Sequence, residues 1–151
     1  VVLSQQDIFE GTLMENISLG LEDVSMQEIQ SLCNKTGLTD YISTLKAGFD
    51  TPLFATGRKL PGHAVKKILL VRALLNKPKL LLLEEPWNGL EEQHQKQIKQ
   101  LLLHEMNKTT VFVITDDGDF AKACDKTIVL KKDGCSIISG NPQMPGGGEN
   151  I

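Results

Sequence analysis

Two short apolar runs constrain the fold of this chain more than any other feature of its sequence. Residues 79–83 (KLLLL) and 109–115 (TTVFVIT) each have the composition of a buried strand. A helical pattern precedes each run, from Pro61 to Asn76 and over residues 91–106. Strands that alternate with helices predict a parallel sheet flanked by helices, whose ligands bind at the carboxyl ends of the strands. The expected fold class is therefore α/β.

The first half of the chain is mostly helical in pattern. It predicts helices over 13–18 and over 25–37, the second with Ser25 and Glu28 as a capping box and Gly37 as its stop. The other expected elements are a strand at 1–4, a helix capped by Thr39 and running to Leu45, a loop over 46–59, a helix over 119–124, and a hairpin over 126–139 that turns at Asp133-Gly134.

These elements divide the chain into four expected segments. They are a strand and turn at 1–11, a helical subdomain at 12–77, a sheet core at 78–140 and a disordered tail at 141–151. The tail is assigned from its glycine and proline content. The opening Val1 is not a start residue, so we expect the chain to be a piece of a longer protein.

Composition excludes several classes of function. The 151 residues are 40% hydrophobic and 23% charged, which is typical of a globular domain. The net charge of −3 offers no basic field for nucleic acid or anionic lipid. No apolar run approaches the ~20 residues of a membrane-spanning helix. The three cysteines, Cys33, Cys124 and Cys135, are odd in number and widely spaced, which favours free thiols in a reducing compartment.

Carboxylates follow both predicted strands. Glu84 and Glu85 come directly after the first strand, and Asp116 comes directly after the second. Because a carboxylate is costly to bury, a charged residue can simply mark the exit of a buried strand. Since the carboxyl ends of parallel strands form the binding edge of such a sheet, these residues are also candidates for a catalytic site.

Three stretches, taken together, favour the catalytic interpretation. FEGTLMENI, LPGHAVKKILLVRALLNKPKLLLLEEPWNGLE and VITDDGDFAKACDKTIVLKKDG occur in the order and spacing of an ATP-binding cassette ATPase of the exporter type. The chain resembles this family from its glutamine loop to about Gly140. The resemblance implies part of a P-loop NTPase-like parallel sheet with a helical subdomain. The phosphate-binding GxxxxGK[ST] loop is absent from the sequence, so we expect the isolated chain not to hydrolyse ATP.

The resemblance also implies roles for particular residues. Glu84 stands where the family has the aspartate that holds Mg²⁺, and Glu85 matches the catalytic glutamate that polarises the attacking water. Gln5, with Gln6 as a close rival, stands at the glutamine that lies near the metal. Asp116 occupies the place of a histidine that contacts the γ-phosphate.

The signature of the family, LSGGQ, lies at the amino end of a long helix, where backbone N–H groups favour an anion. Here the stretch is Leu60-Pro61-Gly62-His63-Ala64. Proline removes a serine hydroxyl and one backbone donor, and His63 adds bulk in place of glycine. His63 could instead supply a cationic contact to phosphate. The nucleotide-binding residues implied by the family are therefore Gln5, Pro61, Gly62, His63 and Asp116, several of them altered.

These departures favour an ABC transporter ATP-binding domain with weakened catalysis. The alternative is a non-catalytic regulatory or assembly module that keeps the fold. The resemblance implies ATP and Mg²⁺ as ligands of the longer protein, which would lie at the cytoplasmic face of a membrane. The implied partners are a second nucleotide-binding domain and a transporter membrane domain, and not nucleic acid; the piece itself is expected to be soluble.

Other residues near the motifs have simpler explanations. The turn Asn88–Glu91 stands where the family has a loop that crosses the dimer interface, and Trp87 before it is expected to be a packing residue. His94 and His104 lie in a polar helical pattern, so both are predicted on a solvated face.

Overall fold

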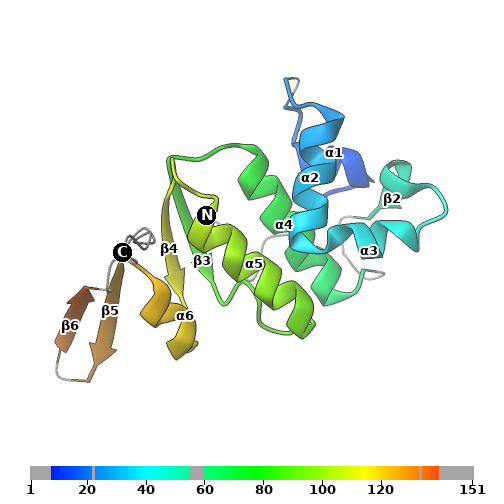
Figure 1. Cartoon of the computed structure of the whole chain (residues 1–151). Helices are drawn as coiled ribbons and strands as arrows, with labels where there is room; N and C mark the ends of the chain where they lie inside the picture. The colour runs from blue at the N-terminus through cyan, green and yellow to red at the C-terminus, as the bar shows by residue number, and fades with distance from the viewer. Residues whose placement is uncertain (1–7, 22, 55–59, 133, 140–151) are drawn as a thin grey trace, which may run out of the picture. The chain divides into compact units, whose positions relative to one another are not determined.

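The computed structural model describes residues 8–21, 23–54, 60–132 and 134–139 (Figure 1). The predicted strand at 1–4, Gln5 and Gln6, and the tail at 141–151 lie outside these ranges. Contacts divide the chain into two compact units, Val1–Ile114 and Thr115–Ile151, each described here by itself. The boundary falls within the 78–140 segment. Within the described ranges, every helix is too short or too polar to span a lipid bilayer.

The core of the first unit is built around one long helix. Helix α4 (Gly62–Leu75) packs against α1 (Leu13–Ser18), α2 (Met26–Thr36) and α3 (Leu38–Ser43). Five apolar residues recur at helical spacing along α4: Ile68, Leu69, Val71 and Leu75 are buried, and Val65 is partly buried. The core cluster contains Ile8, Leu13, Ile17, Ile29, Cys33, Leu38, Leu53, Ile68, Leu69, Val71 and Leu75.

A buried asparagine fixes α1 to α4. Asn16 has no exposed surface, and its Nδ2 donates to the carbonyls of Phe9 at 2.9 Å and Thr12 at 3.0 Å. Its Oδ1 accepts from Phe9 N and from Arg72 Nη2, both at 3.1 Å. Because each polar atom of this side chain has a partner, its burial does not leave an unsatisfied group in the core.

The helix caps agree only in part with those expected. The capping box lies at α1, where Glu15 N donates to Thr12 Oγ1 at 3.1 Å and Thr12 N donates to Glu15 Oε2 at 2.6 Å. At α2, Ser25 Oγ accepts from Glu28 N at 3.2 Å, which is only half of the predicted box among the described bonds. The Thr12 box was missed, although the sequence TLME has the required spacing.

Gly37 ends α2, as the sequence predicts, with a left-handed φ of 70°. It is also the N-cap residue directly before α3. The expected cap at Thr39 is therefore wrong, because fully buried Leu38 already belongs to the next helix. One glycine thus serves both helices and lets α3 start without a linker.

The segment predicted as a loop contains two short elements. The 3₁₀ helix η1 (Gly48–Asp50) precedes strand β2 (Pro52–Leu53), which pairs antiparallel with β1 (Gly11–Thr12). Leu13 N also donates to Thr51 O at 2.9 Å. Pairs of two residues have no periodicity, so the sequence pattern could not reveal them.

Strands β3 (Leu80–Glu84) and β4 (Thr110–Ile114) run parallel, which confirms the parallel pairing. Helix α5 (Glu92–His104) connects them. Their register runs from Leu80↔Thr110 to Glu84↔Ile114.

Among the described residues only one face of this two-stranded sheet is covered, so the prediction of buried strands holds for that face alone. Leu81 and Leu83 are in the core. The opposite face, called here the outer face, is apolar and 37% to 71% exposed; it contains Leu80, Leu82, Phe112 and Ile114. Successive strand side chains point to opposite faces, and the described part of the unit packs on one of them.

The second unit contains helix α6 (Gly118–Ala123) and the antiparallel hairpin of β5 (Lys126–Lys131) and β6 (Gly134–Ser139). The hairpin is confirmed, but Lys131 pairs with Gly134, so Gly134 belongs to β6 rather than to the turn. Asp133 lies outside the described residues. Asp117 caps α6, since its Oδ1 accepts from Asp119 N at 3.1 Å and Phe120 N at 2.9 Å.

Candidate functional site

The two candidate carboxylates lie at the carboxyl end of β3. Glu84 is the exposed last residue of the strand. Glu85 leaves the strand with a left-handed φ of 39°, and its N–H donates to Ile114 O at 2.9 Å. This bond extends the parallel ladder by one residue. The backbone that carries the Glu85 side chain is therefore fixed to the end of β4.

A lysine of α4 connects this strand end to the helical part of the unit. Lys66 Nζ donates to the carbonyl of Asn88 at 2.7 Å and lies 3.5 Å from that of Glu85. The turn itself closes through Asn88 N to Glu85 O at 3.2 Å. Trp87, within the turn, is buried with Lys99 Nζ 5.1 Å from its ring centre, which agrees with a packing role.

The predicted signature stretch forms the start of α4. Pro61 is the residue before the helix rather than its first residue, and its carbonyl accepts from Ala64 N and Val65 N. Pro61, Gly62 and His63 are exposed, and no side chain of the described residues caps this end of the helix. An uncapped helix start presents backbone N–H groups that suit an anion. The buried Ala64 faces the core.

The structure thus places most, but not all, of the predicted site residues in one unit. Glu84, Glu85 and the Pro61–His63 stretch lie in the first unit, where Lys66 joins their elements. Gln5 lies outside the described residues. Asp116 is exposed and belongs to the second unit, just before the Asp117 that caps α6.

The predicted magnesium site is not formed by the described residues alone. Among them, no group of three or more His, Cys, Asp or Glu side chains could hold a metal ion. Mg²⁺ requires oxygen ligands in near-octahedral geometry, to which Glu84 contributes one carboxylate. The second expected ligand, Gln5, lies outside the described part of the chain.

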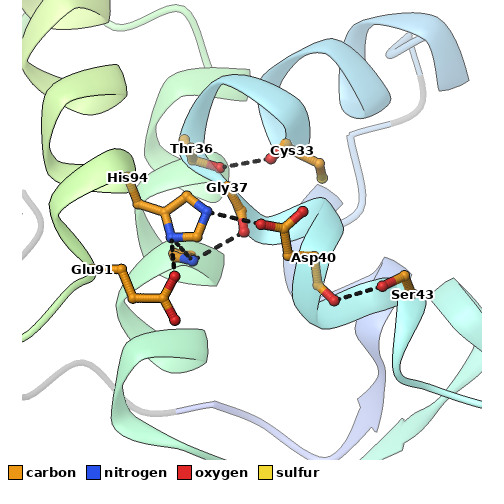
Figure 2. Close-up of polar contacts among 8 residues, drawn as sticks. Cys33, Thr36, Gly37, Asp40, Ser43, Glu91 and His94 are labelled. Carbon is orange, nitrogen blue, oxygen red and sulfur yellow. Dashed lines mark hydrogen bonds and ion pairs between the residues drawn. The ribbon is translucent and has the colours of Figure 1, made fainter.

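His94 belongs to a buried polar cluster that the sequence analysis missed. It is 4% exposed, so the prediction of a solvated face is wrong for this histidine, whereas His104 is exposed as expected. The burial of His94 could have been predicted from its helical spacing to Ile98 and Leu101, which are also buried. Its ring contacts Lys67 Nζ and the carboxylate of Asp40. Figure 2 shows the contact between His94 and Asp40. These polar partners allow an imidazole to lie on a buried stripe.

Comparison with known proteins identifies relatives over most of the chain. The sequence is 32% identical to the ABC multidrug transporter mdr4 of Aspergillus fumigatus over 147 residues, which cover 95% of this chain and 11% of that protein. It is 30% identical to ABC transporter B family member 13 of Arabidopsis thaliana, covering 87% and 10% of the two chains. These relatives are ABC transporters. No protein-family model matches the sequence.

The chain spans about a tenth of the length of the ABC transporters that it matches. Its fold is similar to part of a bacterial Atm1-family ABC exporter solved with ATP bound, with a TM-score of 0.73 and 24% sequence identity. The match covers 83% of this chain and 22% of the exporter chain. The homology to ABC transporters and the mixed α/β fold thus agree with the resemblance noted in the sequence.

Proposed function

We propose that this chain is the C-terminal portion of an ABC transporter ATP-binding domain, in which the longer protein couples ATP binding and hydrolysis to transport across a membrane. The observation that carries the proposal is the position of Glu85 at the carboxyl end of β3, with its backbone bonded to Ile114. Parallel α/β sheets bind their ligands at this edge. Homology to ABC transporters over most of the chain supports the same assignment.

In this proposal Glu85 orients and polarises the water that attacks the terminal phosphate of ATP. Glu84 binds Mg²⁺ through its carboxylate, and Gln5 is the second protein ligand. The exposed start of α4, at Pro61 to His63, faces the nucleotide of a second ATP-binding domain through its backbone N–H groups. The longer protein would meet a membrane domain at the cytoplasmic face of the membrane.

Catalysis in this domain is proposed to be weak. Proline at position 61 lacks an N–H and a hydroxyl, which removes two donors from the anion-binding helix start. Glu84 is one methylene longer than an aspartate, which changes the reach toward a metal. Asp116 carries a negative charge where a phosphate contact is expected, so it repels the nucleotide.

The proposal is tested by steady-state Mg-ATP hydrolysis in the longer domain that includes the residues upstream of Val1. We expect slow turnover that Glu85→Gln abolishes. The control is Glu92→Gln, since Glu92 is an exposed residue of α5 paired with Lys96 at 2.7 Å, and its loss should leave turnover unchanged. If the domain bound nucleotide without turnover, its function would be limited to ATP binding. No nucleotide binding would overturn the proposal in favour of a regulatory or assembly module.

A second measurement concerns the 151-residue chain itself. Because its sequence has no phosphate-binding loop, we expect no micromolar affinity for Mg-ATP by isothermal titration calorimetry. A micromolar dissociation constant would contradict the proposed division of the site between this chain and the upstream residues.

A further inference from the structure

The buried imidazole of His94 lies between three structural elements of the first unit. Its Nδ1 is 3.0 Å from Lys67 Nζ on α4, and its Nε2 is 2.9 Å from Asp40 Oδ2 on α3. A second carboxylate oxygen, Glu91 Oε2 at the start of α5, lies 3.6 Å from the same Nδ1 (Figure 2). Two groups of opposite character, an ammonium and a carboxylate, therefore compete for one ring nitrogen.

The hydrogen bonds assign the protons in this arrangement. A lysine ammonium has donors only, so the Nδ1 atom that Lys67 contacts must be the acceptor. The ring proton of neutral His94 is then on Nε2 and is donated to Asp40. Lys67 also donates to the carbonyl of Gly37 at 3.0 Å. Burial lowers the pKa of Lys67, and the negative charges of Glu91 and Asp40 act in the opposite direction.

The titratable groups around this ring come from each neighbouring element. A cavity of about 190 Å³ beside the ring is lined by His63 and Lys67 of α4, Asp40 and Tyr41 of α3, and Glu91 before α5. The side chains of Asp40 and Glu91 are largely exposed. Solvent protons therefore reach a ring that is itself almost completely covered.

We propose that His94 is a proton-operated switch that exchanges Lys67 for Glu91 as the partner of its Nδ1 atom. When Nδ1 takes up a proton from solvent, its lone pair becomes an N–H that cannot accept from an ammonium. The imidazolium and the ammonium then repel each other, while the Glu91 carboxylate lies near enough to accept the new N–H. Lys67 keeps its bond to Gly37 and loses its own bond to His94 of α5.

The exchange is independent of the proposed ATPase function but acts on the same region. Glu91 is the residue directly before α5, and it ends the turn that Lys66 fixes to α4. Protonation would thus transfer the charged contact of His94 from α4 to the turn that follows Glu84 and Glu85. The mechanism is a change of hydrogen-bond partner, and it requires no ligand.

Double-mutant cycles on the full 151-residue chain test the exchange, with urea unfolding midpoints measured at pH 7.5 and pH 5.5. For the pair His94→Ala and Lys67→Met, we expect a favourable coupling at pH 7.5 that becomes unfavourable at pH 5.5, because the imidazolium and the ammonium repel each other. For His94→Ala and Glu91→Gln, we expect additive shifts at pH 7.5 and a favourable coupling at pH 5.5. The control pair, His104→Ala with Lys67→Met, should be additive at both pH values. A Lys67 coupling that is equal at both pH values would overturn the proposal.

A measurement on the unmodified chain guards against variants that fail to fold. Long-range ¹H–¹⁵N spectra of the imidazole nitrogens report which ring nitrogen carries the proton. We expect the His94 proton on Nε2 at pH 7.5, and on both nitrogens after acidification. A proton on Nδ1 at pH 7.5 would contradict the assigned bond from Lys67 and with it the switch.

Discussion

The imidazole ring of His94 fills the space that any side chain on residue 37 would need. A β-carbon built on Gly37 would overlap Cδ2 of that ring, far inside van der Waals contact. The same glycine has a φ of 70°, which side chains also disfavour. A single position therefore joins a backbone requirement, shared by α2 and α3, to the packing of a buried histidine from α5.

Alanine substitution of this glycine and of a second, unpacked glycine separates the backbone requirement from the packing requirement. Gly37→Ala is expected to lower the free energy of unfolding by roughly 2–5 kcal/mol, because backbone strain and overpacking add. Gly20→Ala is a matched control, since Gly20 has a φ of 73° and open space around it. The control should lose only about 1–2 kcal/mol from backbone strain. Equal losses in urea unfolding would show that His94 does not constrain residue 37.

The capping box of α1 gives a prediction for mildly acidic pH. Hydrogen bonds from the backbone N–H and the hydroxyl of Thr12 lower the pKa of the Glu15 carboxyl. This group stabilises the fold above its unfolded pKa of about 4.5, and the contribution is lost as the pH falls through the lower folded value. Glu15→Gln should flatten the decline of stability between pH 5 and pH 3. Glu10→Gln, a change at a nearby exposed glutamate, should leave that decline unchanged.

Loss of the cap itself is a separate prediction. Thr12→Ala removes the hydroxyl that accepts from Glu15 N, and it should lower the free energy of unfolding by about 1 kcal/mol. Thr12→Ser keeps the acceptor oxygen and should restore most of this loss. Thermal unfolding of both variants tests this prediction. Equal destabilisation by serine and alanine would contradict it.

The three cysteines should react in the order of their exposure. Cys33 is 1% exposed, and burial raises the pKa of its thiol to about 12. Iodoacetamide at pH 8.5 should modify exposed Cys135 first, and Cys33 only when the chain unfolds. Peptide mass spectrometry after timed quenching would detect the order. Early modification of Cys33 would contradict its burial.

The same thiol predicts a loss of stability in alkali. Because the folded pKa lies above the unfolded value of 9.0, the stabilising contribution of protonated Cys33 is complete below pH 9 and is lost as the pH rises through about 12. Cys33→Ala should therefore show a shallower loss of stability above pH 9. Cys135→Ala is the control and should follow the unmodified chain.

The sequence predicted those features that arise from long, regular patterns. The apolar stripe of α4, the parallel pairing of β3 with β4 and the position of Glu85 after β3 all follow from periodicity or local order. Each of these features is indicated by a pattern within a continuous stretch of sequence, including the strand pairing, whose partners are 30 residues apart.

The features that the sequence did not predict depend on distant partners or very short pairings. His94 bonds to Lys67 and Asp40, which are 27 and 54 residues away, so the polar residues of its own helix gave no sign of them. The β1–β2 pair is two residues long. The outer face of β3 and β4 consists of the same residue types as the buried face, so composition could not distinguish the two.

That outer face divides β3 and β4 into positions with different tolerance to mutation. Since the strands pair Leu80 with Thr110, the even-numbered residues of both strands share the exposed face. Leu82 is 37% exposed and Leu81 is 1% exposed, so a polar substitution at Leu82 removes less buried surface than the same change at Leu81. Selection for the stability of the described unit alone would therefore preserve the odd-numbered side chains and leave their even-numbered neighbours free to drift.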